Sequence, residues 1–152
     1  MTTTHPETTP PRAASISMSE ALTAIEERMT CASDRLFDHE FYEGLGADLL
    51  RFHAQLRTHH AVGAYHTGGD SIAQLSPQYA DQIARLHAEH GTLLGMLDRL
   101  IRSVETMCDQ PLEDKEVFAM RVREVIAVTR RHEAEDDRLF YLSLWRDTGG
   151  ES

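Results

Sequence analysis

The sequence predicts an all-helical (all-α) domain folded as an antiparallel four-helix bundle with up-down-up-down topology. In four long segments, apolar residues recur at alternating spacings of three and four, as they do on one face of an amphipathic α-helix. No segment shows the strict apolar–polar alternation that is typical of a strand. Short connections separate the segments, which favours antiparallel packing of neighbouring helices.

Start and stop signals bound the four apolar stripes. The first stripe follows a capping box, Ser17 to Glu20. Gly68-Gly69 ends the second, Ser76-Pro77 begins the third and Pro111 precedes the fourth. The stripes are Met18, Leu22, Ile25, Met29, Ala32 and Leu36; Leu45, Leu49, Phe52, Leu56, His59, Gly63 and His66; Ile83, Leu86, His90, Leu93, Leu97, Leu100, Val104 and Met107; and Phe118, Val122, Val125, Thr129, His132, Asp136 and Leu139.

The composition divides the chain into three parts. We expect a disordered tail over residues 1–15, the bundle over residues 16–147 and a flexible C-terminus over residues 148–152. The tail is rich in Thr and Pro and nearly free of large apolar side chains, so it has little to bury in a core. At 152 residues, the chain has the length of one domain.

The charge of the chain excludes two classes of partner. It carries 15 Lys and Arg against 25 Asp and Glu, a formal net charge of -10. Binding to nucleic acid and docking on anionic lipid both need clustered basic side chains. No stretch has the roughly 20 apolar residues that span a bilayer, and Met1 to Ser15 lacks the apolar core of a secretory signal. We therefore expect a cytoplasmic protein without a nucleic-acid or membrane partner.

Two features outside the central pattern lead to smaller expectations. Cys31 and Cys108 lie on unrelated segments without a CxxC pair, which predicts two buried, reduced thiols. Asp98 and Arg102 stand four residues apart on the flank of the third stripe, which is the spacing of an ion pair along a helix.

Three of the four stripes carry polar residues in mid-helix. These are His59, His90 and the pair of His132 with Asp136. A single histidine on an apolar stripe is usually a hydrogen-bonded core residue. Three of them on three helices favour a metal site instead, because each buried polar group without a partner would cost ~1–3 kcal/mol. Metal sites in bundles are built from side chains on facing helices.

The most specific signal is the segment HEAEDDRLFY, which begins at His132. It places carboxylates three, four and five residues after the histidine, at Glu135, Asp136 and Asp137. The first two project from nearly the same face as His132, so nitrogen and oxygen donors converge on one ion. Glu133 fits a solvated position, whereas Asp136 falls on the apolar stripe.

This segment resembles the corresponding helix of the hemerythrin-like (HHE cation-binding) family, where a histidine is followed by an acidic pair. The segment LHAEHGTLL around His90 is similar to the preceding helix of that family. The resemblance implies a four-helix bundle that binds non-haem iron, mononuclear or dinuclear, for O2 or NO binding, sensing or iron handling. It implies His90, His132, Asp136 and Asp137 as ligands or near-ligands, and the second helix keeps His59.

Two departures from the family pattern remove expected ligands, the bridging acids of the second helix and the histidine of the first. Gly63-Ala64 stands where the second helix usually carries two glutamates, and the first stripe has no histidine. Replacement donors are His53, His60, His66, His87 and Glu135, although His53 and His60 also fit solvated positions. With four or five donors, we expect about one ion per chain rather than an oxo-bridged pair.

Three functions are compatible with these residues. The leading one is an iron-binding protein that binds or senses a diatomic ligand, O2 or NO. The second is a metal-free bundle that serves as an interaction module for an unknown protein partner. The third is an iron enzyme that consumes peroxide or NO, which an open coordination position permits and nothing in the sequence requires.

Overall fold

The computed structural model describes residues 17–31, 38–66 and 77–147, and within these ranges it contains four helices and no strand. The all-helical fold class is therefore confirmed for the described part of the chain. The tail expected at residues 1–15 and the flexible C-terminus expected at residues 148–152 lie outside it, as do Ala32 and Leu36 of the first stripe.

Helix α1, Met18–Cys31, begins at the predicted capping box. The backbone N–H of Glu20 donates to the Ser17 hydroxyl over 3.1 Å, and the backbone N–H of Ser17 donates to the Glu20 carboxylate over 2.7 Å. These bonds satisfy groups that have no intrahelical partner at a helix start. The face that packs inward consists of Ala21, Leu22, Ile25 and Met29.

Helix α2, His39–His66, begins after Asp38. The Asp38 carboxylate accepts a hydrogen bond from the backbone N–H of Phe41 over 2.8 Å, which is a typical N-cap contact. The helix ends before the predicted Gly68-Gly69 stop, which lies outside the described residues. Its buried apolar residues are Tyr42, Leu45, Leu49, Phe52 and Leu56.

Helices α4, Pro77–Met107, and α5, Leu112–Asp147, carry the third and fourth stripes. α4 begins at Pro77 as predicted, and α5 places Glu113 and Asp114 in its first turn, where the helix dipole favours acidic side chains. The buried residues of the two helices are Leu86, His90, Leu93, Leu97, Leu100, Val104, Phe118, Ala119, Val122, Val125, Thr129, His132 and Leu139.

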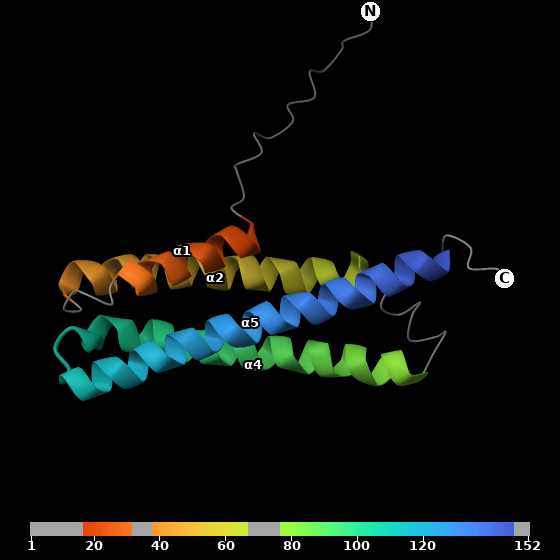
Figure 1. Cartoon of the computed structure of the whole chain (residues 1–152). Coiled ribbons are helices and arrows are strands. Elements are labelled where there is room, and N and C mark those ends of the chain that lie inside the picture. The colour runs from red at the N-terminus through yellow and green to blue at the C-terminus, as the bar shows by residue number, and fades with distance from the viewer. Residues whose placement is uncertain (1–16, 32–37, 67–76, 148–152) are drawn as a thin grey trace, which may run out of the picture.

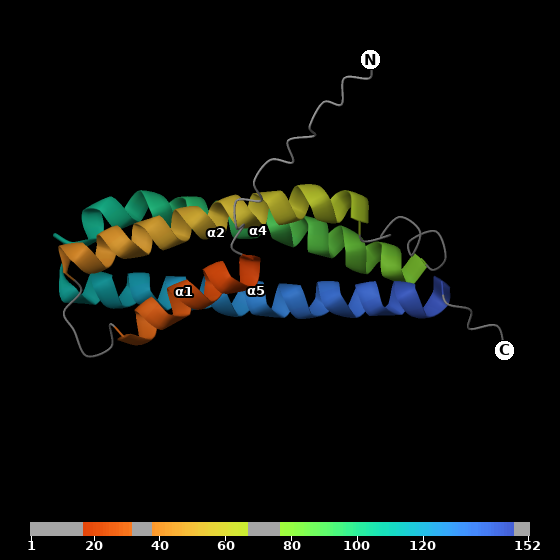
Figure 2. The same cartoon turned by 90° about the horizontal axis from the view of Figure 1, so that it is seen from above.

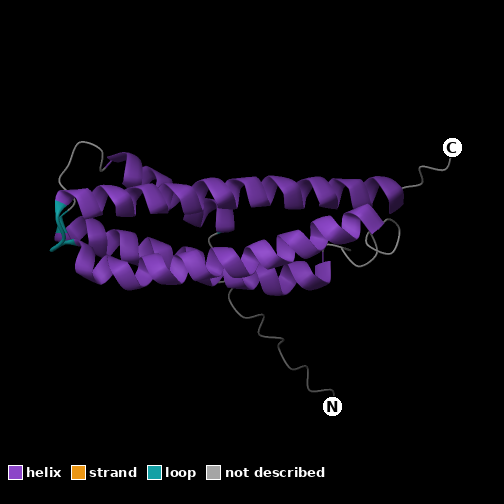
Figure 3. Ribbon diagram, turned by 90° about the horizontal axis from the view of Figure 1, so that it is seen from below, coloured by secondary structure: helices purple, strands orange, loops and turns teal. Residues whose placement is uncertain are grey.

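The four helices lie side by side along one long axis (Figures 1 and 2). α2 packs mainly against α1 and α4, while α5 packs against α4 and, over a smaller contact, α1. One apolar core runs between them, in which each leucine contributes about 1.5–3 kcal/mol by leaving water. Among the described residues, Figure 3 shows helix everywhere except at the ends and in the short connection between α4 and α5.

Charged contacts join neighbouring helices along the flanks of the core. Their partners are Arg28 Nε with Asp48 Oδ2 at 2.6 Å, Arg130 Nη2 with Glu26 Oε2 at 2.8 Å, and His53 Nε2 with Asp98 Oδ1 at 2.9 Å. Each contact spans two helices, so the flanks help to hold the helices together laterally.

Two of the smaller sequence expectations are wrong. Arg102 Nε donates to the backbone oxygen of Asp98 over 3.2 Å, and the Asp98 carboxylate instead contacts His53 across the α2–α4 interface. Cys31 is exposed rather than buried, while Cys108 packs partly buried against the core. None of the described helices combines the length and the apolarity needed to cross a membrane.

Candidate functional site

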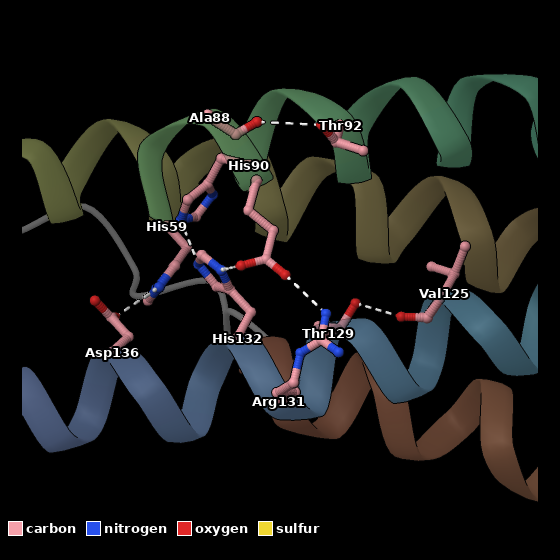
Figure 4. A network of polar contacts seen from close by, with 10 residues as sticks. His59, Ala88, His90, Thr92, Val125, Thr129, Arg131, His132 and Asp136 are labelled. Atoms are coloured by element: carbon pink, nitrogen blue, oxygen red, sulfur yellow. Dashed lines mark hydrogen bonds and ion pairs between the residues drawn. The ribbon is translucent and has the colours of Figure 1, made fainter. Parts of the chain in front are cut away.

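Three of the predicted histidines, from three different helices, lie together in one layer of the bundle (Figure 4). His59 comes from α2, His90 from α4 and His132 from α5. His132 is 1% exposed and His90 is 6% exposed, whereas the side chain of His59 is about one third exposed. The three histidines come together because each occupies a position on its helix's apolar stripe. The layer that they form extends from the buried His132 in the core to the partly exposed His59 at one flank.

His90 and His132 contact each other directly. Their Nε2 atoms are 2.7 Å apart, and the rings meet edge to face with centroids 4.2 Å apart. One nitrogen must donate a proton and the other must accept it, since two lone pairs repel at this distance. The contact thus joins α4 to α5 by a hydrogen bond in the interior of the bundle.

Glu89 of α4 holds the other side of His132. Its Oε2 lies 3.3 Å from His132 Nδ1, and its Oε1 accepts a hydrogen bond from Arg131 Nη2 over 3.3 Å. Burial acts to raise the pKa of Glu89, but the hydrogen bonds from His132 and Arg131, together with the charge of Arg131, outweigh it and lower the pKa below its ordinary value. Glu89 is therefore an ionised acceptor.

His59 pairs with Asp136 and stacks on His90. Its Nε2 lies 3.4 Å from Asp136 Oδ2, and its ring lies 5.8 Å from that of His90 with an angle of 24° between the ring planes. The hydrogen bond with Asp136 raises the pKa of His59 against the effect of burial, and the same bond lowers the pKa of Asp136. The predicted donor Asp136 thus belongs to the layer.

The remaining candidate donors take no part in these contacts. Asp137 is exposed and does not contact the layer. Its negative charge nevertheless helps to raise the pKa of His59. Glu135 and His87 are exposed, and His53 contacts Asp98. The side chains of His60 and His66 lie outside the described part of the chain.

Glu89 and Glu133 are residues of the site that the sequence interpretation missed. Glu133 is only partly exposed rather than solvated, and burial raises the pKa of its carboxyl. A signal for both exists in the sequence. Glu89 follows the core residue Leu86 by three positions and Glu133 follows Thr129 by four, so each lies at the edge of an apolar stripe.

The donor types in the layer fit non-haem iron or zinc, which imidazole and carboxylate ligands both suit. Their arrangement fits only in part. Among the described residues, no three His, Cys, Asp or Glu side chains are grouped so that they hold one ion. The donors stand instead as two pairs, His90 with His132 and His59 with Asp136. The 2.7 Å separation in the first pair is a hydrogen-bond distance. It is shorter than the roughly 3.3 Å between two nitrogens that each lie ~2.0–2.1 Å from one tetrahedral cation, so the two rings would have to move apart to hold an ion.

Comparison with known proteins gave no match. No protein-family model, curated protein or solved structure matches this chain. The resemblance to hemerythrin-like proteins therefore stays an expectation from the sequence, and it is most specific in the segments around His90 and His132.

Proposed function

We propose that this chain is a hemerythrin-like, cytoplasmic metal-binding protein that holds one non-haem iron ion, or zinc in its place, in the histidine layer. The proposed donors are His59, His90, His132 and Asp136. The observation that carries the proposal is the close approach of the His90 and His132 Nε2 atoms, 2.7 Å apart in the core. A cation would take both lone pairs in place of the shared proton once the two nitrogens have moved apart, because each metal–nitrogen bond is ~2.0–2.1 Å long.

Nearby charge supports a cation at this place. Asp136 and Glu89 are ionised beside the layer. The hydrogen bond with His59 lowers the pKa of Asp136, and the hydrogen bonds with His132 and Arg131 lower the pKa of Glu89. To join the site, His59 and Asp136 would exchange the contact between them for contacts with the ion. The side chain of His59 is about one third exposed, and such side chains change rotamer readily.

The antiparallel up-down-up-down topology is part of the same proposal. In Figure 1 the colour runs in opposite directions along successive helices, which supports it. This arrangement brings His59, late in α2, level with His90, near the middle of α4 (Figure 4).

One ion suits the layer better than two. α2 carries Gly63 and Ala64 in place of bridging acids. Glu26 of α1 is held by Arg130 through two hydrogen bonds, of 3.0 and 2.8 Å, so this carboxylate is already engaged away from the layer. When bound, iron would supply an open coordination position for a diatomic ligand, O2 or NO. The residues of this chain would fix the ion and shield it from water.

A second candidate function is a metal-free bundle that serves as an interaction module. The separation of the donors into two hydrogen-bonded pairs favours it, because each polar side chain already has a partner without a cation. Metal content distinguishes the two functions.

The test measures iron and zinc by mass spectrometry after anaerobic reconstitution of the full chain. We expect about one ion per chain in the parent and background levels in His90→Ala and His132→Ala. His53→Ala is the matched control, because His53 contacts Asp98 outside the layer, and it should keep the parent's metal content. A parent that takes up no ion favours the metal-free function, and unchanged binding by both layer variants excludes these ligands. Two ions per chain would contradict the mononuclear site.

A further inference from the structure

We propose that Glu89 is a positioning residue that fixes the tautomer of His132, with the proton on Nδ1 and the lone pair of Nε2 directed into the histidine layer. Glu89 Oε2 lies 3.3 Å from His132 Nδ1, and His90 Nε2 lies 2.7 Å from His132 Nε2. These two contacts lie on opposite sides of one buried ring. Neither the metal content nor the identity of an ion enters this assignment.

The direction of each hydrogen bond follows from what the groups are able to donate. An ionised carboxylate only accepts, so His132 Nδ1 must be the donor to Glu89. A neutral imidazole then has its lone pair on Nε2. His90 must therefore donate from its own Nε2 to His132. The order of donation runs from His90 to His132 to Glu89.

Arg131 keeps Glu89 in this role. Its Nη2 donates to Glu89 Oε1 over 3.3 Å, which leaves Oε2 for the histidine. Arg131 directly precedes His132 on α5, so the helix that carries the histidine also carries the group that holds its partner on α4. The three side chains form a path from solvent to core, with exposed fractions of 65% for Arg131, 18% for Glu89 and 0% for His132.

The consequence for metal binding rests on the proposed function. In this tautomer His132 is ready to coordinate, because no proton has to leave its Nε2. His90 is the opposite case, since its Nε2 carries the proton that a cation displaces. Partners that orient a metal-binding histidine in this way typically change metal affinity by about 10–100-fold when they are removed.

The first arm of the test uses the metal-free full chain and needs no ion. Two-bond proton–nitrogen correlation spectra identify the tautomer of each histidine, at about pH 8 where neutral rings prevail. We expect the Nδ1–H form for His132 in the parent, with the exposed His39 as the solvated reference. Glu89→Ala should lose the predominance of this form. Glu135→Ala is the matched control, because Glu135 is exposed. In this variant His132 should keep the Nδ1–H form.

Two results would overturn the assignment. One is an Nε2–H tautomer for His132 in the parent, which decides the matter even if Glu89→Ala does not fold. The other is a folded Glu89→Ala protein in which His132 keeps the parent's tautomer, since a buried ring held by packing alone would behave in that way.

The second arm titrates Zn2+ into the same proteins against a competing chelator. We expect Glu89→Ala to bind Zn2+ about 10–100-fold more weakly than the parent and Glu135→Ala to match the parent. If Glu89→Ala and the parent bind Zn2+ equally well, Glu89 does not position His132 for metal binding. The tautomer assignment is then decided by the spectra alone. A parent that does not bind Zn2+ counts against the proposed function, and the tautomer result still stands or falls by the first arm.

Discussion

Asp48 is a carboxylate buried on α2, 5% exposed, and its partner is the guanidinium of Arg28 on α1. The guanidinium lies against Gly44, where a Cβ atom would overlap it. Arg51 is a second cation, but its Nη1 is 3.9 Å from Asp48 Oδ1. A buried charge without a partner is costly, so Asp48 needs the guanidinium of Arg28 beside it. Gly44 leaves room for that guanidinium because it has no Cβ atom.

We expect Gly44→Ala to lower the free energy of unfolding by about 1–2 kcal/mol, because the cost of a buried carboxylate that loses its hydrogen bond, about 1–3 kcal/mol, exceeds the roughly 0.5–1 kcal/mol that alanine gains as a helix former. Gly91→Ala is the control, because nothing lies within 4 Å of a Cβ at that position. Alanine is the better helix former there, so this control should gain about 0.5–1 kcal/mol. Chemical denaturation measures both. Stabilisation by both substitutions would show that Arg28 keeps its contact with Asp48 in another side-chain conformation.

The burial of His90 and His132 and the partial burial of Asp136 followed from the sequence, because each falls on an apolar stripe and helical periodicity is a local property. Their role as ligands stays a prediction. The contact of Glu89 with His132 was out of reach, because it depends on which helices are neighbours and how each is rotated. The same reason explains why Asp98 contacts His53 rather than Arg102.

Helix α1 is the shortest of the four helices, with 14 residues against 36 in α5. Its start was predictable, since the capping box is a contact between residues three apart in sequence. Its attachment to α5 was not, because Glu26 and Arg130 are 104 residues apart. Two parallel hydrogen bonds join them, and the bonds lower the pKa of Glu26 below its ordinary value of 4.5.

This pKa shift gives the stability of the protein a defined dependence on acid. Since the pKa of Glu26 is lower in the folded chain, the ionised pair stabilises the fold at neutral pH. That stability is lost as the pH falls below 4.5 through the folded-state pKa. We expect Glu26→Gln to lower the melting temperature at about pH 7 and to leave it nearly unchanged at about pH 3. The effect should stay below about 1 kcal/mol, because both side chains are more than one third exposed.

Thermal melts of the parent and of Glu26→Gln at both pH values measure this difference. Glu27→Gln is the control, because Glu27 is an exposed neighbour on the same helix. It should change the melting temperature little at either pH. A loss of stability that is equal in acid and at neutral pH would mean that the side chain contributes through packing rather than charge.

For the whole molecule, the fold class followed from four stripes of the same period, whose apolar faces have to be buried together. A stripe of leucines does not by itself fix how far one helix is shifted along its neighbour. A shift of one turn, about 5.4 Å, brings leucines against other leucines at little loss of apolar burial. The sequence period therefore predicts a bundle more securely than it predicts one alignment of the helices.

The histidine layer removes this freedom. His90 meets His132, and His59 meets Asp136, in a single alignment, and a shifted helix would set each against apolar side chains at a cost of about 1–3 kcal/mol per group. We expect a variant with leucine at all four positions to unfold at higher denaturant concentration while its NMR lines broaden, as several alignments interconvert. A single sharp set of NMR lines from that variant would show that the histidine layer is not needed to select one alignment of the helices. The layer therefore lowers the stability of the bundle but selects a single alignment of its helices, with or without a bound ion.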